Sequence, residues 1–207
     1  PVFSAASPRG IDWMGADILF RSALTRFYFR SLNVIRVRQY EADHRALREA
    51  LRRVRAGRCV GLFPEGGIRA GEPSMLGSHG KLYDGAFMVA MTTRTPVLPC
   101  LLIGSDRLYN PRFFLKRPPI WARFGAPIPV VGKGREEIAR LRTETISAIR
   151  RLADELRAEG EAREEDWPQT PQQRPDGGPV KHGKNQDLET RRHGDLGTGE
   201  RIQFSLS

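Results

Sequence analysis

Apolar residues recur along residues 1–158 with two different periods. Stretches with apolar residues three and four positions apart predict helices, and shorter apolar runs predict strands. We expect helices over residues 17–30, 43–56, 84–93 and 136–159, and strands over residues 34–38, 59–63, 96–103 and 120–124. Because helices and strands alternate along the chain, the predicted fold class is α/β, a layered domain with a mixed, largely parallel sheet flanked by helices.

The helix expected over residues 17–30 allows two interpretations, because it combines a broad apolar face with basic residues. Its apolar residues include Leu19, Leu24 and Phe27, and arginines stand among them at positions 21, 26 and 30. The simpler interpretation is a helix in the protein core. In the alternative, the aromatic side chains enter a lipid interface while the arginines contact lipid headgroups.

The composition of the chain changes near Gly160. Residues 159–207 are rich in proline, glycine, glutamine and charge and have few large apolar side chains, so we expect a disordered tail. The folded domain is therefore predicted over residues 1–158. The 207 residues give room for one such domain, and they contain no uninterrupted apolar run long enough to span a membrane.

The charge balance indicates an acidic partner. The formal net charge is +10, and residues 1–158 carry the whole positive excess, because residues 159–207 hold 7 basic and 10 acidic residues. Anionic lipid, phosphorylated small molecules and nucleic acid are the partner classes that fit. Cys59 and Cys100 lack the spacing of a zinc site or a disulfide framework, so no metal is expected and a reducing cytosolic setting fits best.

Candidate chemistry concentrates after the strand predicted over residues 59–63. That strand runs into Pro64, Glu65, Gly66 and Gly67, with Arg69 shortly beyond. Ligands of open α/β sheets bind at the carboxyl ends of the strands. There the two glycines allow a close backbone approach and turn N–H groups toward an anion, Arg69 offers a bidentate donor to phosphate, and Glu65 orients a hydroxyl or an arginine. A tight turn with a surface glutamate is the simpler alternative.

Three segments together resemble one family. Phe63-Pro64-Glu65-Gly66 follows a strand, Pro96-Val97-Leu98-Pro99 comes about thirty residues later, and Phe124-Gly125-Ala126-Pro127-Ile128 follows. In this order and spacing they resemble the PlsC-type glycerolipid (1-acylglycerol-3-phosphate) acyltransferases. The resemblance covers about residues 1–156.

The resemblance implies a catalytic block that residues 1–207 do not show in its usual place. The family uses an HxxxxD motif, whose histidine acts as a general base, and this motif precedes the other blocks. We expect it just upstream of Pro1, so that the chain is a fragment that binds substrate but hardly turns over. His79 to Asp84 matches HxxxxD literally, but it follows the Phe63-Pro64-Glu65-Gly66 block, so we assign it no catalytic role.

The resemblance also implies which residues contact the substrates. The acceptor lysophospholipid would be held by Arg38, Glu65, Gly66, Gly67 and Arg69, and Pro99 would lie on the acyl-donor side. Two positions depart from the family pattern: Gln39 stands where an arginine is usual, with Arg38 as its nearest replacement, and Ile68 displaces the second arginine to Arg69.

The implied function is transfer of a fatty acyl group from acyl-CoA or acyl carrier protein to a hydroxyl of a lysophospholipid, in phospholipid biosynthesis. The implied partners are these two substrates and an anionic membrane surface, with a cytoplasmic, peripheral location on the inner face of the membrane; no metal or cofactor is implied. One alternative is a non-catalytic lipid-binding relative of the same fold. A nucleic-acid-binding module formed by the arginines of residues 45–55 is the other, but Glu49 interrupts them and no aromatic stacking platform accompanies them, so no nucleic acid is expected.

Overall fold

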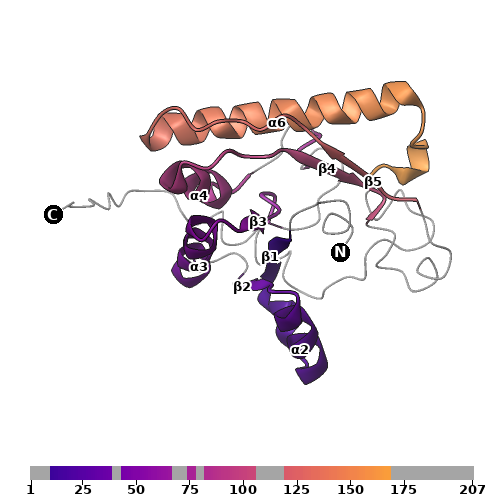
Figure 1. The fold of residues 1–207 in the computed structure, drawn as a ribbon. Helices are drawn as coiled ribbons and strands as arrows, with labels where there is room; N and C mark the ends of the chain where they lie inside the picture. The colour runs from indigo at the N-terminus through magenta and orange to yellow at the C-terminus, as the bar shows by residue number, and fades with distance from the viewer. Residues whose placement is uncertain (1–9, 39–42, 67–73, 78–81, 106–118, 169–207) are drawn as a thin grey trace, which may run out of the picture.

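The computed structural model describes residues 10–38, 43–66, 74–77, 82–105 and 119–168. Within them the chain forms an α/β fold that begins with a parallel sheet (Figure 1). The strands of this sheet are β1 (Ile11–Ala16), β2 (Ile35–Val37) and β3 (Cys59–Gly61), in the order β2-β1-β3. The central strand, β1, was not among the predicted elements.

The sequence prediction for residues 17–30 was wrong in its details. Instead of one helix the structure has a short 3-10 helix, η1 (Asp17–Phe20), and then the helix α2 (Ala23–Ser31). Ser22 separates them because its hydroxyl accepts the Thr25 N–H at 3.1 Å and so caps α2. The core interpretation was also wrong for α2, none of whose residues is buried.

The remaining predicted elements are present with shifted ends. Helix α3 (His44–Arg55) is capped by Asp43, and α4 (Gly85–Thr93) precedes an antiparallel pair, β4 (Cys100–Ile103) and β5 (Trp121–Phe124). Helix α6 (Gly134–Glu159) ends at Gly160, which has a φ of +66°. Within the described residues β4 and β5 form a second sheet of their own, not part of one mixed sheet.

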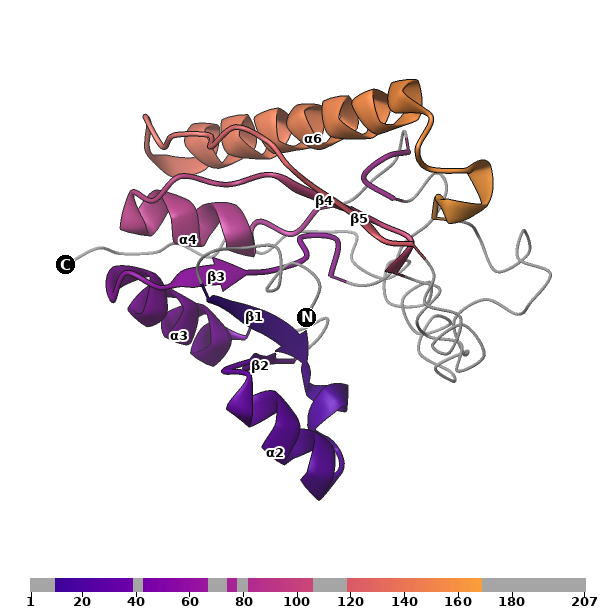
Figure 2. The same ribbon diagram turned by 45° about the vertical axis from the view of Figure 1, so that its right-hand side comes forward.

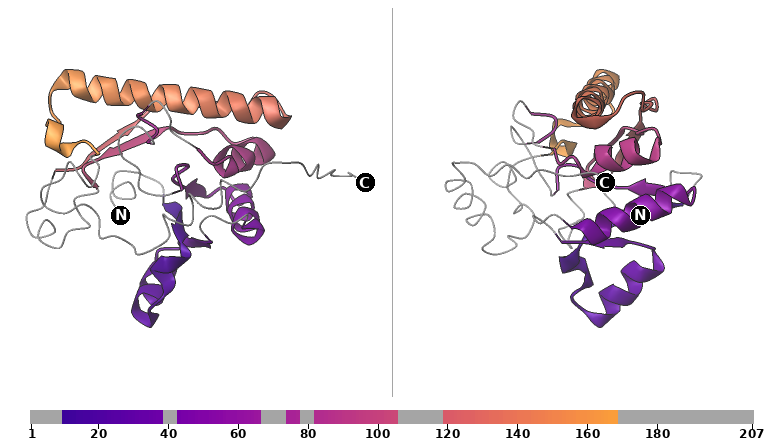
Figure 3. Two further views of the ribbon diagram at one scale, coloured as in Figure 1. Left: turned by 180° about the vertical axis from the view of Figure 1, so that it is seen from behind. Right: turned by 90° about the vertical axis from the view of Figure 1, so that its left-hand side faces the viewer.

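The elements stack in layers, seen end-on in Figure 3. Helix α3 packs on β2 and β3 of the parallel sheet, α4 packs on α3, and α6 packs on α4 and β4. Helix α4 is apolar all round because it is covered on two sides: Phe87 belongs to a core cluster with α6 and β4, whereas Val89 joins Ile35, Ala46 and Ala50.

The buried core extends past the composition change at residue 159. Trp167 follows the 3-10 helix η3 (Glu164–Asp166), is buried in the α6 cluster, and lies against the Arg157 guanidinium at 4.0 Å from its ring centroid. Trp167, together with Ala162, thus packs residues 160–168 against the core. Among the described residues no helix combines the length and apolarity needed to cross a membrane.

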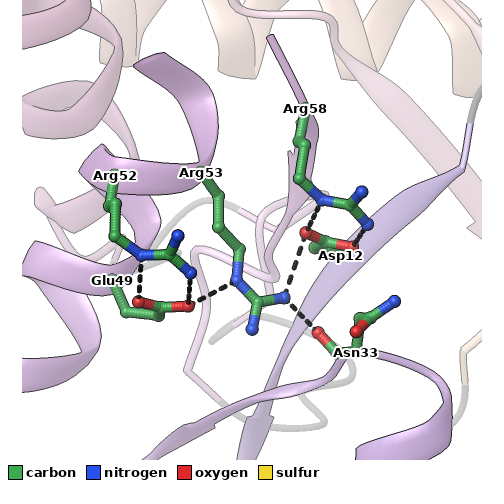
Figure 4. A network of polar contacts seen from close by, with 6 residues as sticks. All are labelled: Asp12, Asn33, Glu49, Arg52, Arg53 and Arg58. Carbon is green, nitrogen blue, oxygen red and sulfur yellow. Dashed lines mark hydrogen bonds and ion pairs between the residues drawn. The ribbon is translucent and has the colours of Figure 1, made fainter. Parts of the chain in front are cut away.

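A buried ion-pair network joins the elements of the parallel sheet (Figure 4). Asp12 of β1 is 1% exposed, and both of its carboxylate oxygens accept hydrogen bonds from Arg58, just before β3. Arg53 of α3 lies 3.0 Å from the same carboxylate and also donates to the carbonyl of Asn33, ahead of β2. The Asp12 carboxylate therefore ties β1 to α3 and β3, and through Arg53 to the residues ahead of β2. The hydrogen bonds from Arg58, which have the largest effect, and from Arg53 hold the pKa of Asp12 below its usual value.

Candidate functional site

The carboxyl ends of the three parallel strands form one edge of the sheet. Residue Arg38 directly follows β2, and Phe63-Pro64-Glu65-Gly66, which we call the FPEG turn, begins two residues after β3. Because β1 lies between them, strands β2 and β3 are two strand spacings apart, about 10 Å. The register pairs Val37 with Ala16 and Gly61 with Trp13, so β2 ends further along β1 than β3 does.

The two faces of the parallel sheet differ in character. Ile35 and Val60 pack with residues of α3 on one face. On the other face Arg36 is paired with Gly15, and Trp13 lies two residues before Gly15, so the side chains of Arg36 and Trp13 point to the same side. The site edge therefore combines a guanidinium and an aromatic ring on the face that α3 does not cover.

An aromatic pair extends from this face to the FPEG turn. The rings of Trp13 and Phe63 stack with centroids 5.5 Å apart and an interplanar angle of 17°. Phe63 is nevertheless more than half exposed, so the pair presents apolar surface at the edge. Such surface next to guanidinium groups suits an amphipathic ligand with a phosphate and a hydrocarbon chain.

The FPEG turn is fixed by backbone hydrogen bonds. The Gly66 N–H donates to the Phe63 carbonyl at 3.1 Å, and the Tyr83 N–H donates to the Pro64 carbonyl at 2.8 Å. Gly66 has a φ of +69°, and a Cβ at this position would lie 2.5 Å from Cε2 of Tyr83. The turn and the tyrosine ring thus both require glycine at this position. The sequence had indicated that the Gly66 N–H points toward an anion, but in the structure this N–H closes the turn.

The carboxylate of Glu65 holds a neighbouring segment. Its Oε1 accepts the backbone N–H of Met75, whose side chain is buried in the α6 cluster. Glu65 therefore links the turn to residues 74–77, a contact between residues ten apart that sequence reasoning did not foresee. Its predicted role toward a substrate hydroxyl or an arginine stays a prediction.

Arg38 is held at the edge by its backbone. Its N–H donates to Oδ2 of Asp43 at 3.0 Å, while Oδ1 of Asp43 accepts the N–H groups of Arg45 and Ala46 at the start of α3. These hydrogen bonds keep the pKa of Asp43 below its usual value, and the bond from the Arg38 N–H has the largest effect. The exposed side chain of Arg38 is therefore carried by a backbone anchored to a helix cap.

The remaining residues that the sequence singled out lie outside the described residues or are buried. Gly67, Arg69 and His79 lie outside the described residues. Pro99 is fully buried, and a Cβ on Gly125 would lie 3.5 Å from Cβ of Pro99, so in this structure Pro99 contributes to packing. Among the described residues no group of three or more acidic, histidine or cysteine side chains could hold a metal ion.

Comparison with known proteins identifies the family of the chain that forms this edge. Residues 1–103, which include β1 to β4 and the FPEG turn, match the family model described as Acyltransferase. The chain belongs to the acyltransferase family. A search of curated proteins gave no match.

A solved structure that resembles the chain is the crystal structure of the 1-acyl-sn-glycerophosphate (LPA) acyltransferase, PlsC, from Thermotoga maritima. It is 22% identical in sequence, with a TM-score of 0.49, and the match covers 71% of this chain. The chain covers 57% of the length of that protein.

Sequence reasoning did not single out three residues at or near this edge of the sheet. Trp13, Arg36 and Tyr83 border the FPEG turn or share its side of the sheet, yet none belongs to the segments that carry the resemblance. The alternation of apolar and basic residues at 34–38 did place Arg36 on a strand. Nothing local marks Trp13 or Tyr83, because each meets the turn through a contact distant in sequence.

Proposed function

We propose that the chain acts in a glycerolipid acyltransferase that moves a fatty acyl group from acyl-CoA or acyl carrier protein to a hydroxyl of a lysophospholipid such as 1-acylglycerol-3-phosphate. One observation carries the proposal: an acyltransferase-family chain places Arg38, Arg36 and the FPEG turn at one edge of its sheet, beside the Trp13–Phe63 stack. Guanidinium groups bind phosphate, and the aromatic surface accepts hydrocarbon. These are the two chemical parts of such an acceptor.

The proposed reaction is a direct transfer between the two substrates. A general base removes the proton of the acceptor hydroxyl, whose oxygen attacks the thioester carbonyl carbon. The tetrahedral intermediate then expels the thiolate of the donor, which takes up a proton, and leaves the new ester. Burial raises the pKa of the Cys100 thiol to about 11, so this cysteine stays protonated and is a poor nucleophile at neutral pH.

The described residues supply acceptor positioning in this scheme. Arg38, with Arg36 behind it, is proposed to bind the acceptor phosphate, and Glu65 and Gly66 to fix the turn over which the glycerol lies. Gly67 and Arg69 are proposed to complete this subsite, and Pro99 to shape the donor side from within. The base is proposed to be the histidine of a family HxxxxD block outside residues 1–207; His79, which follows the FPEG turn in sequence, is not assigned to it.

Arg38→Ala is expected to raise the KM for 1-acylglycerol-3-phosphate by roughly 10- to 100-fold, because a charge-assisted hydrogen bond to phosphate contributes about 1.5–3 kcal/mol. The backbone N–H bonded to Asp43 is retained in this variant, so the fold should not change. Steady-state kinetics on the natural full-length chain, with monoacylglycerol as a phosphate-free acceptor, provide the measurement.

The matched control is Arg48→Ala, which removes an exposed arginine from α3. It should leave the KM for both acceptors within about twofold, in keeping with the small effects of surface substitutions. If Arg38→Ala weakened the phosphate-free acceptor just as much, Arg38 would not be a phosphate ligand.

A further inference from the structure

Helix α2 projects from the parallel sheet (Figure 2), and its apolar side chains are exposed. None of its nine residues is buried, and Leu24 and Phe27 are 79% and 75% exposed, with Tyr28 about half exposed. These three lie three and four residues apart and therefore share one face of the helix. An apolar face of this kind in contact with water indicates that something else covers it.

The inner side of α2 is attached to the fold through aromatic contacts. Phe29 packs against the buried Phe20 of η1, with ring centroids 5.7 Å apart, and η1 is the principal packing partner of α2. Arg26 and Arg30, one turn apart, form an exposed row next to Phe27. Helix α2 thus has an anchored inner side, an outer apolar strip and a basic flank.

The stretch of chain between Asp17 and Glu41, which includes α2, carries charge of one sign only. Between Asp17 and Glu41 the sequence has arginines at positions 21, 26, 30, 36 and 38 and no acidic residue. In a symmetric dimer made through α2, the same face would meet itself and bring these arginines together. An anionic surface instead complements them, so the charge pattern favours anionic lipid over a second copy of the chain.

The position of α2 relates it to the acceptor edge. Helix η1 directly follows the carboxyl end of β1, the edge at which Arg38 and the FPEG turn lie. A Cβ on Gly15 would lie 3.3 Å from Cδ1 of Leu19, so η1 reaches the same face of the sheet as Trp13 and Arg36. Because α2 packs on η1, it is held close to the edge of the proposed acceptor site.

We infer that α2 docks the protein on an anionic bilayer, with Leu24, Phe27 and Tyr28 in the interfacial region and Arg26 and Arg30 against lipid phosphates. Interfacial helices combine an apolar strip with basic residues in this way. The inference deepens the proposed function. Its biological purpose rests on that function, because docking would bring the protein to a lysophospholipid acceptor that resides in the membrane. The docking itself requires no turnover.

The test is vesicle co-sedimentation of residues 1–207 without acyl donor or lysophospholipid. We expect binding to vesicles of phosphatidylcholine with 30% phosphatidylglycerol, and at least about tenfold weaker binding to pure phosphatidylcholine, because the basic flank needs anionic lipid. The double variant Leu24→Ser/Phe27→Ser should lose at least about tenfold in affinity for the anionic vesicles. Both side chains are exposed, so circular dichroism should be unchanged.

Two further variants distinguish docking through α2 from non-specific hydrophobic binding and from electrostatic attraction alone. Val131→Ser removes an apolar side chain that is 69% exposed on another surface and should bind like the parent chain. Arg26→Gln/Arg30→Gln should weaken binding and flatten its salt dependence. Equal binding by the Leu24→Ser/Phe27→Ser and Val131→Ser variants would overturn the inference. So would a dimer in analytical ultracentrifugation that Leu24→Ser/Phe27→Ser abolishes, if the parent chain did not bind vesicles.

Discussion

Asp12→Asn is expected to lower the free energy of unfolding by about 2–4 kcal/mol, the scale of removing one partner from a buried ion pair. The substitution removes the Asp12 charge from Arg53, which is only 15% exposed and keeps Glu49 at 2.7 Å as a counter-charge, whereas Arg58 is 46% exposed and can turn to solvent. Urea denaturation followed by circular dichroism measures the effect. Because Asp12 ties β1 to α3, β3 and the residues before β2, acceptor binding should weaken as well.

The pH dependence gives this prediction a second test. The pKa of Asp12 is lowered in the folded protein, so its stabilising contribution is present above the unfolded pKa of about 3.9 and is lost as the pH falls through the folded value. The difference in stability between the parent chain and Asp12→Asn should therefore shrink below about pH 4. Asp154→Asn, on the exposed side of α6, is the control and should change stability by less than about 0.5 kcal/mol. A small, pH-independent effect of Asp12→Asn would contradict the account.

Gly66→Ala is expected to destabilise the protein by about 2–3 kcal/mol, in two parts. A non-glycine residue at a φ of +69° costs about 1–2 kcal/mol. The added Cβ would also lie 2.5 Å from Cε2 of Tyr83, so the ring or the turn must move. Because Glu65 precedes this glycine, we also expect a higher KM for the lysophospholipid acceptor. Thermal or urea denaturation and steady-state kinetics measure the two effects.

A matched glycine separates the two parts of this cost. Gly57 has a φ of +76°, and a Cβ added there would have no atom within 4 Å among its described neighbours, so Gly57→Ala should show the backbone cost alone. In a Tyr83→Ala background the cost of Gly66→Ala should fall to about that of Gly57→Ala, as measured by a double-mutant cycle. Equal costs for Gly66→Ala and Gly57→Ala in the parent chain would show that Tyr83 does not constrain the turn.

Elements specified by nearby residues were predictable from the sequence. Helix α3 begins after Asp43, whose carboxylate accepts the first N–H groups of that same helix, and α6 ends at Gly160. Strand β1 was missed because Asp12 and Gly15 interrupt its apolar pattern. Its buried carboxylate becomes acceptable only through Arg53 and Arg58, more than forty residues away, and no local pattern announces them.

The candidate site also combines features that nearby residues specify with features that depend on residues distant in sequence. The FPEG turn could be found because a strand followed by a proline, a carboxylate and glycines is a local signal, whereas Arg38 was indicated by the family resemblance alone. The contacts that shape the turn could not be found, since Trp13, Met75 and Tyr83 reach it from other segments. The exposure of α2 was equally unpredictable, because an apolar helix face has the same sequence pattern whether protein or lipid covers it.

The most direct test of the central claim is acyl transfer to 1-acylglycerol-3-phosphate by the natural chain, with any residues that precede Pro1 included. CoA release from acyl-CoA is followed with a thiol reagent, and the diacyl product by mass spectrometry. The account predicts release that depends on the acceptor, with one product molecule per CoA, and at least about 100-fold slower turnover by residues 1–207 alone, the contribution of a positioned general base. Vesicle binding without any acceptor-dependent release from the natural chain would contradict the claim and identify a lipid-binding relative.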